Sequence, residues 1–275
     1  MAQSSIETVN ARPAPRGLAW GLTHWWRNFL GLFPLVGLLA AGVLVTPIPF
    51  LLSPDRAGKV VGNGMFRLWA RWILRVFGVR VWVKGAHNID PASNCVIVSN
   101  HRSHLDVPCI GVTLPYNLAT LHKRSLEYVP LLGQALWMSR SIGLDRSDKA
   151  GAQRRLKLVA QRLSTGRSIL VFAEGRRSRG PALEPFKKGA FLIALEQHCP
   201  IQPVSILGAD AVYAPGHVMI RRGDILVVVH PPVDTRGMTL DDRDTLTRAV
   251  QDTVAGAFTA GPVAPAALVG ATRVI

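Results

Sequence analysis

Short apolar runs alternate with amphipathic stretches along most of the chain, from Val79 to about Phe258. The short runs have the length of buried strands and predict them at Val79–Lys84, Cys95–Ser99, Asn117–Leu121, Ser168–Phe172, Ile201–Leu207 and Ile225–His230. Apolar positions at helical spacing predict helices at Val107–Leu114, Tyr128–Met138, Lys149–Leu163, Lys187–Gln197 and Leu240–Ala257. This alternation indicates an α/β domain with a mostly parallel central sheet flanked by helices.

A longer apolar segment, Phe29–Leu52, lies near the N-terminus and contains no charged residue. Because a helix needs about 20 apolar residues to cross the hydrocarbon core of a bilayer, this segment is long enough to span one. Pro34 near its start, and Pro47 and Pro49 near its end, would bend or break such a helix. A single span and a re-entrant hairpin both fit this pattern, whereas a cleaved secretory signal does not. We therefore expect a retained membrane anchor.

Met65–Phe77 is predicted to form an amphipathic helix. Arg67, Arg71 and Arg75 recur every four residues and form one basic stripe, while tryptophans and other apolar residues occupy the remainder. A basic, tryptophan-containing helix beside an apolar segment is typical of a helix that lies in the headgroup layer of a membrane. The alternative is a surface helix packed on the globular domain.

These patterns divide the chain into three parts. Residues 1–78 are interpreted as an N-terminal, membrane-associated helical segment that anchors the protein, and residues 79–258 as the α/β domain. Residues 259–275 are rich in Ala, Gly, Pro and Val, and we expect them to form a flexible tail.

Composition narrows the classes of protein to which the chain can belong. Of its 275 residues, 48% are hydrophobic, which excludes disordered and fibrous proteins. The formal net charge of +15 favours phosphate-bearing partners, which could be nucleic acid, anionic lipid or a phosphorylated substrate. Cys95, Cys109 and Cys199 form no CxxC pair, so the sequence favours a reducing compartment over a disulfide scaffold or a cysteine-rich zinc site.

His101 and Asp106 follow the predicted strand Cys95–Ser99 at a strand-to-helix junction. A histidine can take a proton near neutral pH, and a carboxylate can fix its tautomer. On one regular helix, side chains five residues apart diverge by about 140°. The two side chains can therefore meet only if His101 lies in the turn and Asp106 in the first helical turn. A polar loop with a capping aspartate is one alternative, and a metal site with His101 and His104 is another.

Asn100–Asp106 resembles the signature of the glycerolipid acyltransferases, a histidine followed by four residues and an aspartate. It is most similar to that of the bacterial 1-acyl-sn-glycerol-3-phosphate (lysophosphatidate) acyltransferases. Further blocks resemble that family in the same order, at Leu121–Gly133, Val171–Gly189 and Ile201–Val204. The resemblance implies that His101 is the general base and that Asp106 orients its ring.

The resemblance also implies a substrate-binding group: Lys123, Glu174, Gly175, Arg176 and Arg177. Arg177 corresponds to the family's arginine, which can bind phosphate through two parallel hydrogen bonds, and Lys123 would add a point charge. Gly175, after an apolar strand, would let the backbone turn sharply or approach a ligand. Taken without the other blocks, the arginines also fit a solvated basic loop.

Three positions depart from the family pattern. Ala173 stands where proline is usual, Arg176 where threonine is usual, and Ser125 where glutamate is frequent. The histidine–aspartate pair is unchanged, so the departures bear on the headgroup of the acceptor rather than on acyl transfer.

The implied reaction transfers a fatty acyl group from acyl-CoA or acyl-carrier protein to the sn-2 hydroxyl of lysophosphatidate, giving phosphatidate for phospholipid biosynthesis. A related O-acyltransferase acting on glycerol 3-phosphate or a lyso-aminolipid is the first alternative. A basic protein that only binds nucleic acid or anionic lipid is the second, and the absence of a nucleic-acid recognition module disfavours a nucleic-acid partner. We expect membrane lipids as partners, no metal or organic cofactor, and a location at the cell inner membrane with the catalytic domain on its cytoplasmic face. The oligomeric state stays open.

Overall fold

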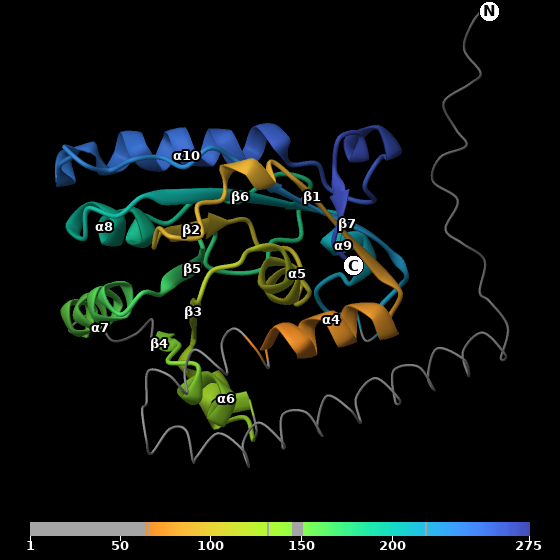
Figure 1. Ribbon diagram of the computed structural model, residues 1–275, viewed down its shortest axis with the longest axis horizontal. Helices are drawn as coiled ribbons and strands as arrows, with labels where there is room; N and C mark the ends of the chain where they lie inside the picture. Colours follow the sequence, from red (N-terminus) through yellow and green to blue (C-terminus); the bar gives the residue numbers. More distant parts are fainter. Residues whose placement is uncertain (1–63, 65, 131, 145–150, 218) are drawn as a thin grey trace, which may run out of the picture.

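The computed structural model describes residues 64, 66–130, 132–144, 151–217 and 219–275. Its strands form one 8-stranded sheet, and helices cover both faces (Figure 1). The strands are β1 (Val79–Lys84), β2 (Val96–Ser99), β3 (Leu118–Lys123), β4 (Ile142–Leu144), β5 (Ser168–Phe172), β6 (Ile201–Leu207), β7 (Gly223–Val229) and β8 (Thr272–Arg273). The α-helices are α4 (Phe66–Val76), α5 (Asp106–Thr113), α6 (Leu132–Met138), α7 (Ala152–Ser164), α8 (Gly189–Glu196), α9 (Ala209–Val212) and α10 (Arg243–Ala257).

The sheet has the strand order β4-β3-β5-β2-β6-β7-β1-β8 and is mostly parallel. Only β6 with β7 and β1 with β8 pair antiparallel among these strands. The predicted α/β class with a mostly parallel, helix-flanked sheet is therefore confirmed. β2 lies between β5 and β6, and all its residues are buried, so the loop that follows β2 begins at the interior of the sheet.

Two apolar cores lie on opposite faces of the sheet. Successive side chains of a strand point to opposite faces, and β2 divides accordingly: Ile97 belongs to one core, and Val96 and Val98 to the other. The first core packs against α4, α5 and α9, and the second against α7, α8 and α10. Burial on both faces explains why the strands read as continuous apolar runs rather than as alternating ones.

Most predicted elements are present, and one helix differs for an identifiable reason. β1, β5 and β6 have the predicted bounds. The helix predicted at Tyr128–Met138 begins only at Leu132, because Arg124–Tyr128 forms a 3-10 helix, η3. Val129 precedes Pro130 and is extended, at φ −77° and ψ 120°. A residue before proline is sterically driven out of the helical region, so the two turns cannot merge.

α4 packs on the domain and presents two of its three basic residues on the outside. Ala70 and Leu74 are fully buried in the first core. Arg67 donates hydrogen bonds through Nη2 to the carbonyl oxygens of Leu114 and Tyr116, at 2.9 and 3.0 Å. Burial lowers the pKa of its guanidinium. Arg67 therefore belongs to the packing of the helix on the domain, and the exposed part of the predicted stripe is Arg71 and Arg75.

The predicted anchor, Phe29–Leu52, lies outside the described residues. In the ranges that the structure does describe, no helix is both long enough and apolar enough to cross a bilayer. The proposed division of the chain into residues 1–78, 79–258 and 259–275 stays a prediction.

The C-terminal residues differ from the flexible tail expected at 259–275. Thr272–Arg273 forms β8 and pairs with β1, and the backbone N–H of Val274 donates to the carbonyl of Val81 at 2.8 Å. Ile275 is buried. The β-branched residues of this segment favour an extended backbone, and the edge of β1 offers hydrogen-bonding groups that the segment can use.

Candidate active site

The turn after β2 is fixed by a buried asparagine. Asn100 donates through Nδ2 to the carbonyl of Ile206 at 2.9 Å, and its Oδ1 accepts the Ile206 backbone N–H at 2.8 Å. The side-chain amide thus replaces a backbone peptide in pairing with β6. The main chain can leave the sheet directly after Ser99, and His101 starts the loop at the carboxyl edge of the sheet.

His101 and Asp106 meet across this turn. The Nδ1–H of His101 donates to Oδ2 of Asp106 at 2.8 Å, and Asp106 is fully buried as the first residue of α5. The same oxygen accepts the backbone N–H groups of Arg102 and Ser103, at 2.7 and 2.8 Å. These donors partly offset the cost of burying a carboxylate. This is the geometry that the spacing requires, and it leaves Nε2 of His101 for a substrate.

Phe172 holds the plane of the histidine ring. It is the last residue of β5, and its ring stacks on that of His101 with 4.0 Å between centroids and 14° between planes. The hydrogen bond to Asp106 and this stack together restrain both torsions of the side chain. A base held in this way loses little rotational freedom when it takes up a proton.

Glu174 ties the catalytic turn to a second loop. Its Oε1 accepts the backbone N–H of His101 at 2.7 Å, and its Oε2 accepts that of Glu184 at 2.9 Å. The residue is 2% exposed. The sequence placed Glu174 among the substrate-binding residues, but both carboxylate oxygens are engaged by the protein itself. Glu174 is therefore a positioning residue in this structure.

Gly175 is required by its backbone conformation and by a close neighbour. Its φ is +73°, a region that side chains disfavour, and a Cβ there would lie 2.9 Å from Cδ and Cε of Lys187. The side chain of Lys187 crosses the backbone at this point. Lys187 is a cation near the predicted substrate loop that the sequence analysis did not single out as a site residue.

The two neighbouring arginines of this loop have different partners. A guanidinium N–H of Arg177 contacts Nε2 of His104. Arg176 forms an exposed ion pair with Glu184, through Nη2 and Oε1 at 2.9 Å. Burial, and then the charge of Arg177, lower the pKa of His104, so this imidazole stays neutral and accepts the hydrogen bond. Nε2 of His104 and Nδ1 of His101 are thus both engaged by protein groups, and the described residues contain no cluster of three or more His, Cys, Asp or Glu side chains that could hold a metal ion.

Lys123 lies at the carboxyl end of β3, where it is exposed. β3 is separated from β2 by β5, and these three parallel strands end at the same edge of the sheet as the His101 turn. The structure therefore brings Lys123 to the correct edge, two strands away from His101. Arg177 reaches the His101 turn itself, through its contact with His104.

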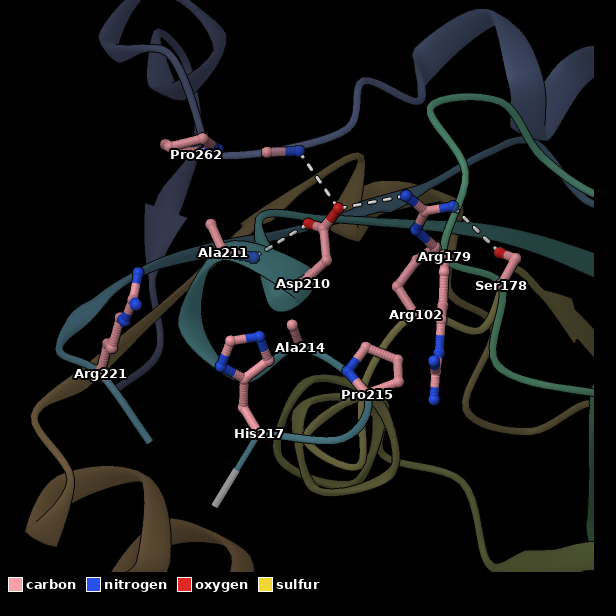
Figure 2. Close-up of a pocket in the computed structure, with 11 residues that line it drawn as sticks. Arg102, Ser178, Arg179, Asp210, Ala211, Ala214, Pro215, His217, Arg221 and Pro262 are labelled. Carbon is pink, nitrogen blue, oxygen red and sulfur yellow. Dashed lines mark hydrogen bonds and ion pairs between the residues drawn. The ribbon is translucent and has the colours of Figure 1, made fainter. Parts of the chain in front are cut away.

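Arg102 is a candidate that the sequence analysis missed. Its guanidinium is buried, and it donates through Nη1 to Ser178 Oγ at 3.0 Å and through Nη2 to Asp210 Oδ2 at 3.2 Å (Figure 2). The ring of Phe258 lies below it, 5.0 Å from the guanidinium carbon. Arg102 thus connects the catalytic turn to two distant segments. Its place inside the histidine–aspartate motif was the only signal that pointed to it.

Comparison with known proteins places this site in a family. Residues 80–207 match the family model described as Acyltransferase. Over 222 residues, the chain is 32% identical to the 1-acyl-sn-glycerol-3-phosphate acyltransferase alpha of Homo sapiens, covering 80% of this chain and 77% of the relative. The chain belongs to the 1-acyl-sn-glycerol-3-phosphate acyltransferase family.

Other members of the family extend this similarity. The 1-acyl-sn-glycerol-3-phosphate acyltransferase of Limnanthes douglasii is 30% identical over 214 residues, or 76% of this chain and 72% of the relative. The crystal structure of the 1-acyl-sn-glycerophosphate acyltransferase of Thermotoga maritima matches with a TM-score of 0.73 and 25% identity, over 86% of this chain and 95% of that chain. The family predicted from the four sequence blocks is confirmed.

Proposed function

We propose that this acyltransferase transfers a fatty acyl group from a thioester donor to the sn-2 hydroxyl of lysophosphatidate, giving phosphatidate. The observation that carries the proposal is the 2.8 Å contact between His101 Nδ1 and the buried Asp106 Oδ2, which leaves Nε2 for the acceptor hydroxyl. The names of the relatives support lysophosphatidate as the acceptor. Acyl-CoA and acyl-carrier protein are the two donors to be compared.

The reaction follows from the tautomer of His101, which carries its proton on Nδ1 and has an unprotonated Nε2. Nε2 of His101 takes the hydroxyl proton while the hydroxyl oxygen attacks the carbonyl carbon of the thioester. The carbon–sulfur bond of the resulting tetrahedral intermediate then breaks, and the imidazolium returns the proton to the leaving thiolate. Asp106 keeps the proton on Nδ1 and stabilises the imidazolium through its charge. No covalent acyl-enzyme is required, because the thioester is already activated.

Arg177 is the proposed ligand of the acceptor's phosphate. It is half-buried and contacts His104, which lies three residues after His101 in the same turn. A phosphate bound there would hold the glycerol backbone of the lysolipid next to the base. Lys123 adds positive charge along the same sheet edge. Arg176 faces Glu184 instead, so the departure at this position alters the rim of the site rather than the phosphate contact.

An acceptor panel tests the proposal. Detergent-purified protein is supplied with radiolabelled palmitoyl-CoA and, in separate reactions, with lysophosphatidate, glycerol 3-phosphate or a lyso-aminolipid. We expect labelled phosphatidate from lysophosphatidate and at least about 10-fold lower kcat/KM for the other two acceptors. A lyso-aminolipid lacks the phosphate, and a lost charge-assisted contact costs at least ~1.4 kcal/mol. Glycerol 3-phosphate keeps the phosphate but lacks the acyl chain, and with it the apolar surface that binding would bury. A product from glycerol 3-phosphate or the lyso-aminolipid alone would assign this chain to the alternative reaction.

We further propose that α4 lies against the cytoplasmic leaflet of the inner membrane. Leu68 is 57% exposed, and Arg71 and Arg75 are exposed on the same helix. Anionic lipid attracts such arginines, and each contributes about 1 kcal/mol near the surface. The net charge of +15 acts in the same direction. This placement would bring the sheet edge to a lipid acceptor and leave it open to a soluble donor.

A dye on α4 reports this contact. Because Cys95, Cys109 and Cys199 are buried, Leu68→Cys can be labelled selectively with a polarity-sensitive fluorophore. We expect its emission to shift to the blue in nanodiscs of anionic lipid, and the shift to be lost in the Arg71→Gln/Arg75→Gln background.

The matched control carries the same dye at Leu240, which is 52% exposed on the side of the domain covered by α10. Equal shifts at residues 68 and 240, or a shift at 68 that persists without the two arginines, would contradict the proposed orientation.

A further inference from the structure

A cavity lies beside the catalytic turn, and Arg102 of that turn lines it together with Ser178 and Arg179 of the loop that carries Arg177. Its volume is about 520 Å³, a size typical of small-molecule sites. The polar lining comes from the turn itself, from the loop after β5 and from the segment after β6 (Figure 2). These polar residues are Arg102, Ser178, Arg179, Asp210, His217 and Arg221.

The cavity has an excess of positive charge. Asp210 is its one carboxylate among the described lining residues, and it already accepts hydrogen bonds from Arg102 at 3.2 Å and from the backbone N–H of Gly261 at 3.2 Å. Arg179 and Arg221 line the cavity and lie on opposite sides of it (Figure 2). In the described part of the chain, neither guanidinium has a carboxylate within ion-pair distance. The charge balance therefore favours an anion with more than one negative charge.

Part of the lining is apolar. Ala211, Ala214, Pro215 and Pro262 contribute small or flat surfaces between the two arginines. An inorganic anion would make no use of these surfaces, whereas a planar ring could pack on them. A ligand that satisfies both parts of the lining has anionic groups joined to a planar ring, and a nucleotide is such a ligand.

The cavity shares a wall with the reaction centre. The backbone N–H of Ser178 donates to the carbonyl of His101 at 3.0 Å, and Ser178 Oγ accepts from Arg102 at 3.0 Å. Along the same loop, Arg177 turns to His104 and Arg179 turns to the cavity. One loop therefore separates two basic sites, one on the side of His104 and one on the side of Asp210.

We propose that this cavity binds the phosphorylated nucleotide end of a coenzyme A thioester. The inference rests on the proposed function, in which a thioester must reach His101, and it names the donor. The acceptor carries one phosphate close to its reacting hydroxyl, and Arg177 suits that group. The phosphates of coenzyme A are attached to adenosine and lie at the far end of a flexible arm from the thioester. The charge and the apolar surfaces of the cavity match them.

The test uses the double variant Arg179→Gln/Arg221→Gln, which removes the two guanidinium groups that line the cavity on opposite sides. Calorimetry measures binding of 3′-phosphoadenosine 5′-phosphate, which requires no turnover. We expect its Kd to rise at least about 10-fold, because charge-assisted hydrogen bonds are lost. The KM for palmitoyl-CoA should rise by a similar factor, while kcat and the KM for lysophosphatidate stay within about two-fold. The KM for palmitoyl-pantetheine, which lacks the nucleotide, should be equal in variant and wild type.

The control for position 221 is Arg222→Gln, which removes one positive charge at the neighbouring residue. The side chain of Arg222 lies against Gly78 rather than in the cavity, so its Kd should equal that of the wild type. Unchanged nucleotide affinity in the double variant would overturn the proposal. So would a wild type that does not bind the nucleotide, or a rise in the KM for lysophosphatidate alone. If the wild type acylates no lysophosphatidate, the proposed function fails, while calorimetry still decides what the cavity binds.

Discussion

Replacing His101 with alanine is expected to lower kcat by about 10²–10⁴-fold, the contribution of a positioned general base. The ring, stacked on Phe172 and bonded to Asp106, accepts the proton through Nε2. Alanine leaves no group at this position that could accept the proton. The KM for lysophosphatidate should change little, because the proposed phosphate contact is with Arg177. Steady-state rates with labelled palmitoyl-CoA measure both quantities.

Two variants separate catalysis from folding in this experiment. His87→Ala removes an exposed imidazole outside the site and should keep full activity. His104→Gln keeps an acceptor for Arg177 and should lose only a few-fold, about 1 kcal/mol, which would distinguish the two histidines of the motif. A folded His101→Ala enzyme that retains most of its turnover would refute the general-base mechanism.

Asp106→Asn is expected to lower kcat by about 10²–10³-fold while the protein stays folded. The backbone N–H groups of Arg102 and Ser103 both point at the position of Oδ2, so an oxygen of the asparagine amide is held there. Nδ1 of His101 can then keep its proton, and the loss comes from the missing charge beside the imidazolium. A substitution that also puts the catalytic histidine in the wrong tautomer lowers kcat by about 10⁴-fold. Asp106→Asn keeps the tautomer, so we expect a smaller loss of kcat.

Asp106→Ala provides the comparison. Without an acceptor, two buried backbone N–H groups lose their hydrogen bonds, and each costs about 1–3 kcal/mol of unfolding free energy. Urea denaturation should therefore show a large loss of stability for alanine and a small one for asparagine, with kcat reduced in both. Equal stability of the two variants would contradict the proposed role of the carboxylate in holding the turn.

The sequence predicted the long, periodic elements well and missed the short ones. β4, β8 and α9 contain 3, 2 and 4 residues. A hydrophobic pattern becomes recognisable only over about four residues in a strand and about 11 in a helix, so these elements are too short to show one. The late start of α6 was foreseeable from Pro130, whose effect on the preceding residue is local. β8 depends on the edge of β1, a contact between the two ends of the described domain that no local pattern records.

The candidate site shows the same division between local and distant contacts. His101 and Asp106 lie five residues apart, so turn geometry could predict their meeting. Glu174 accepts a hydrogen bond from the backbone of a residue 73 positions away, which no local pattern records. The sequence offered only the motif that contains Glu174, and this motif suggested a contact with the substrate. The partner of Arg102 in the buried ion pair, Asp210, lies 108 positions away and outside every recognised block. Pairings of this kind are set by the fold.

The loop after β5 is divided into a constrained part and a free part. Glu174 and Ser178 are buried and bonded to the catalytic turn, whereas the side chain of Arg176 is 69% exposed and pairs with Glu184 at the surface. Evolution can therefore vary residue 176, and with it the charge met by an incoming headgroup, without disturbing the base. A designer who wishes to redirect this enzyme to another lysolipid has the same freedom, and position 176 is the place to begin.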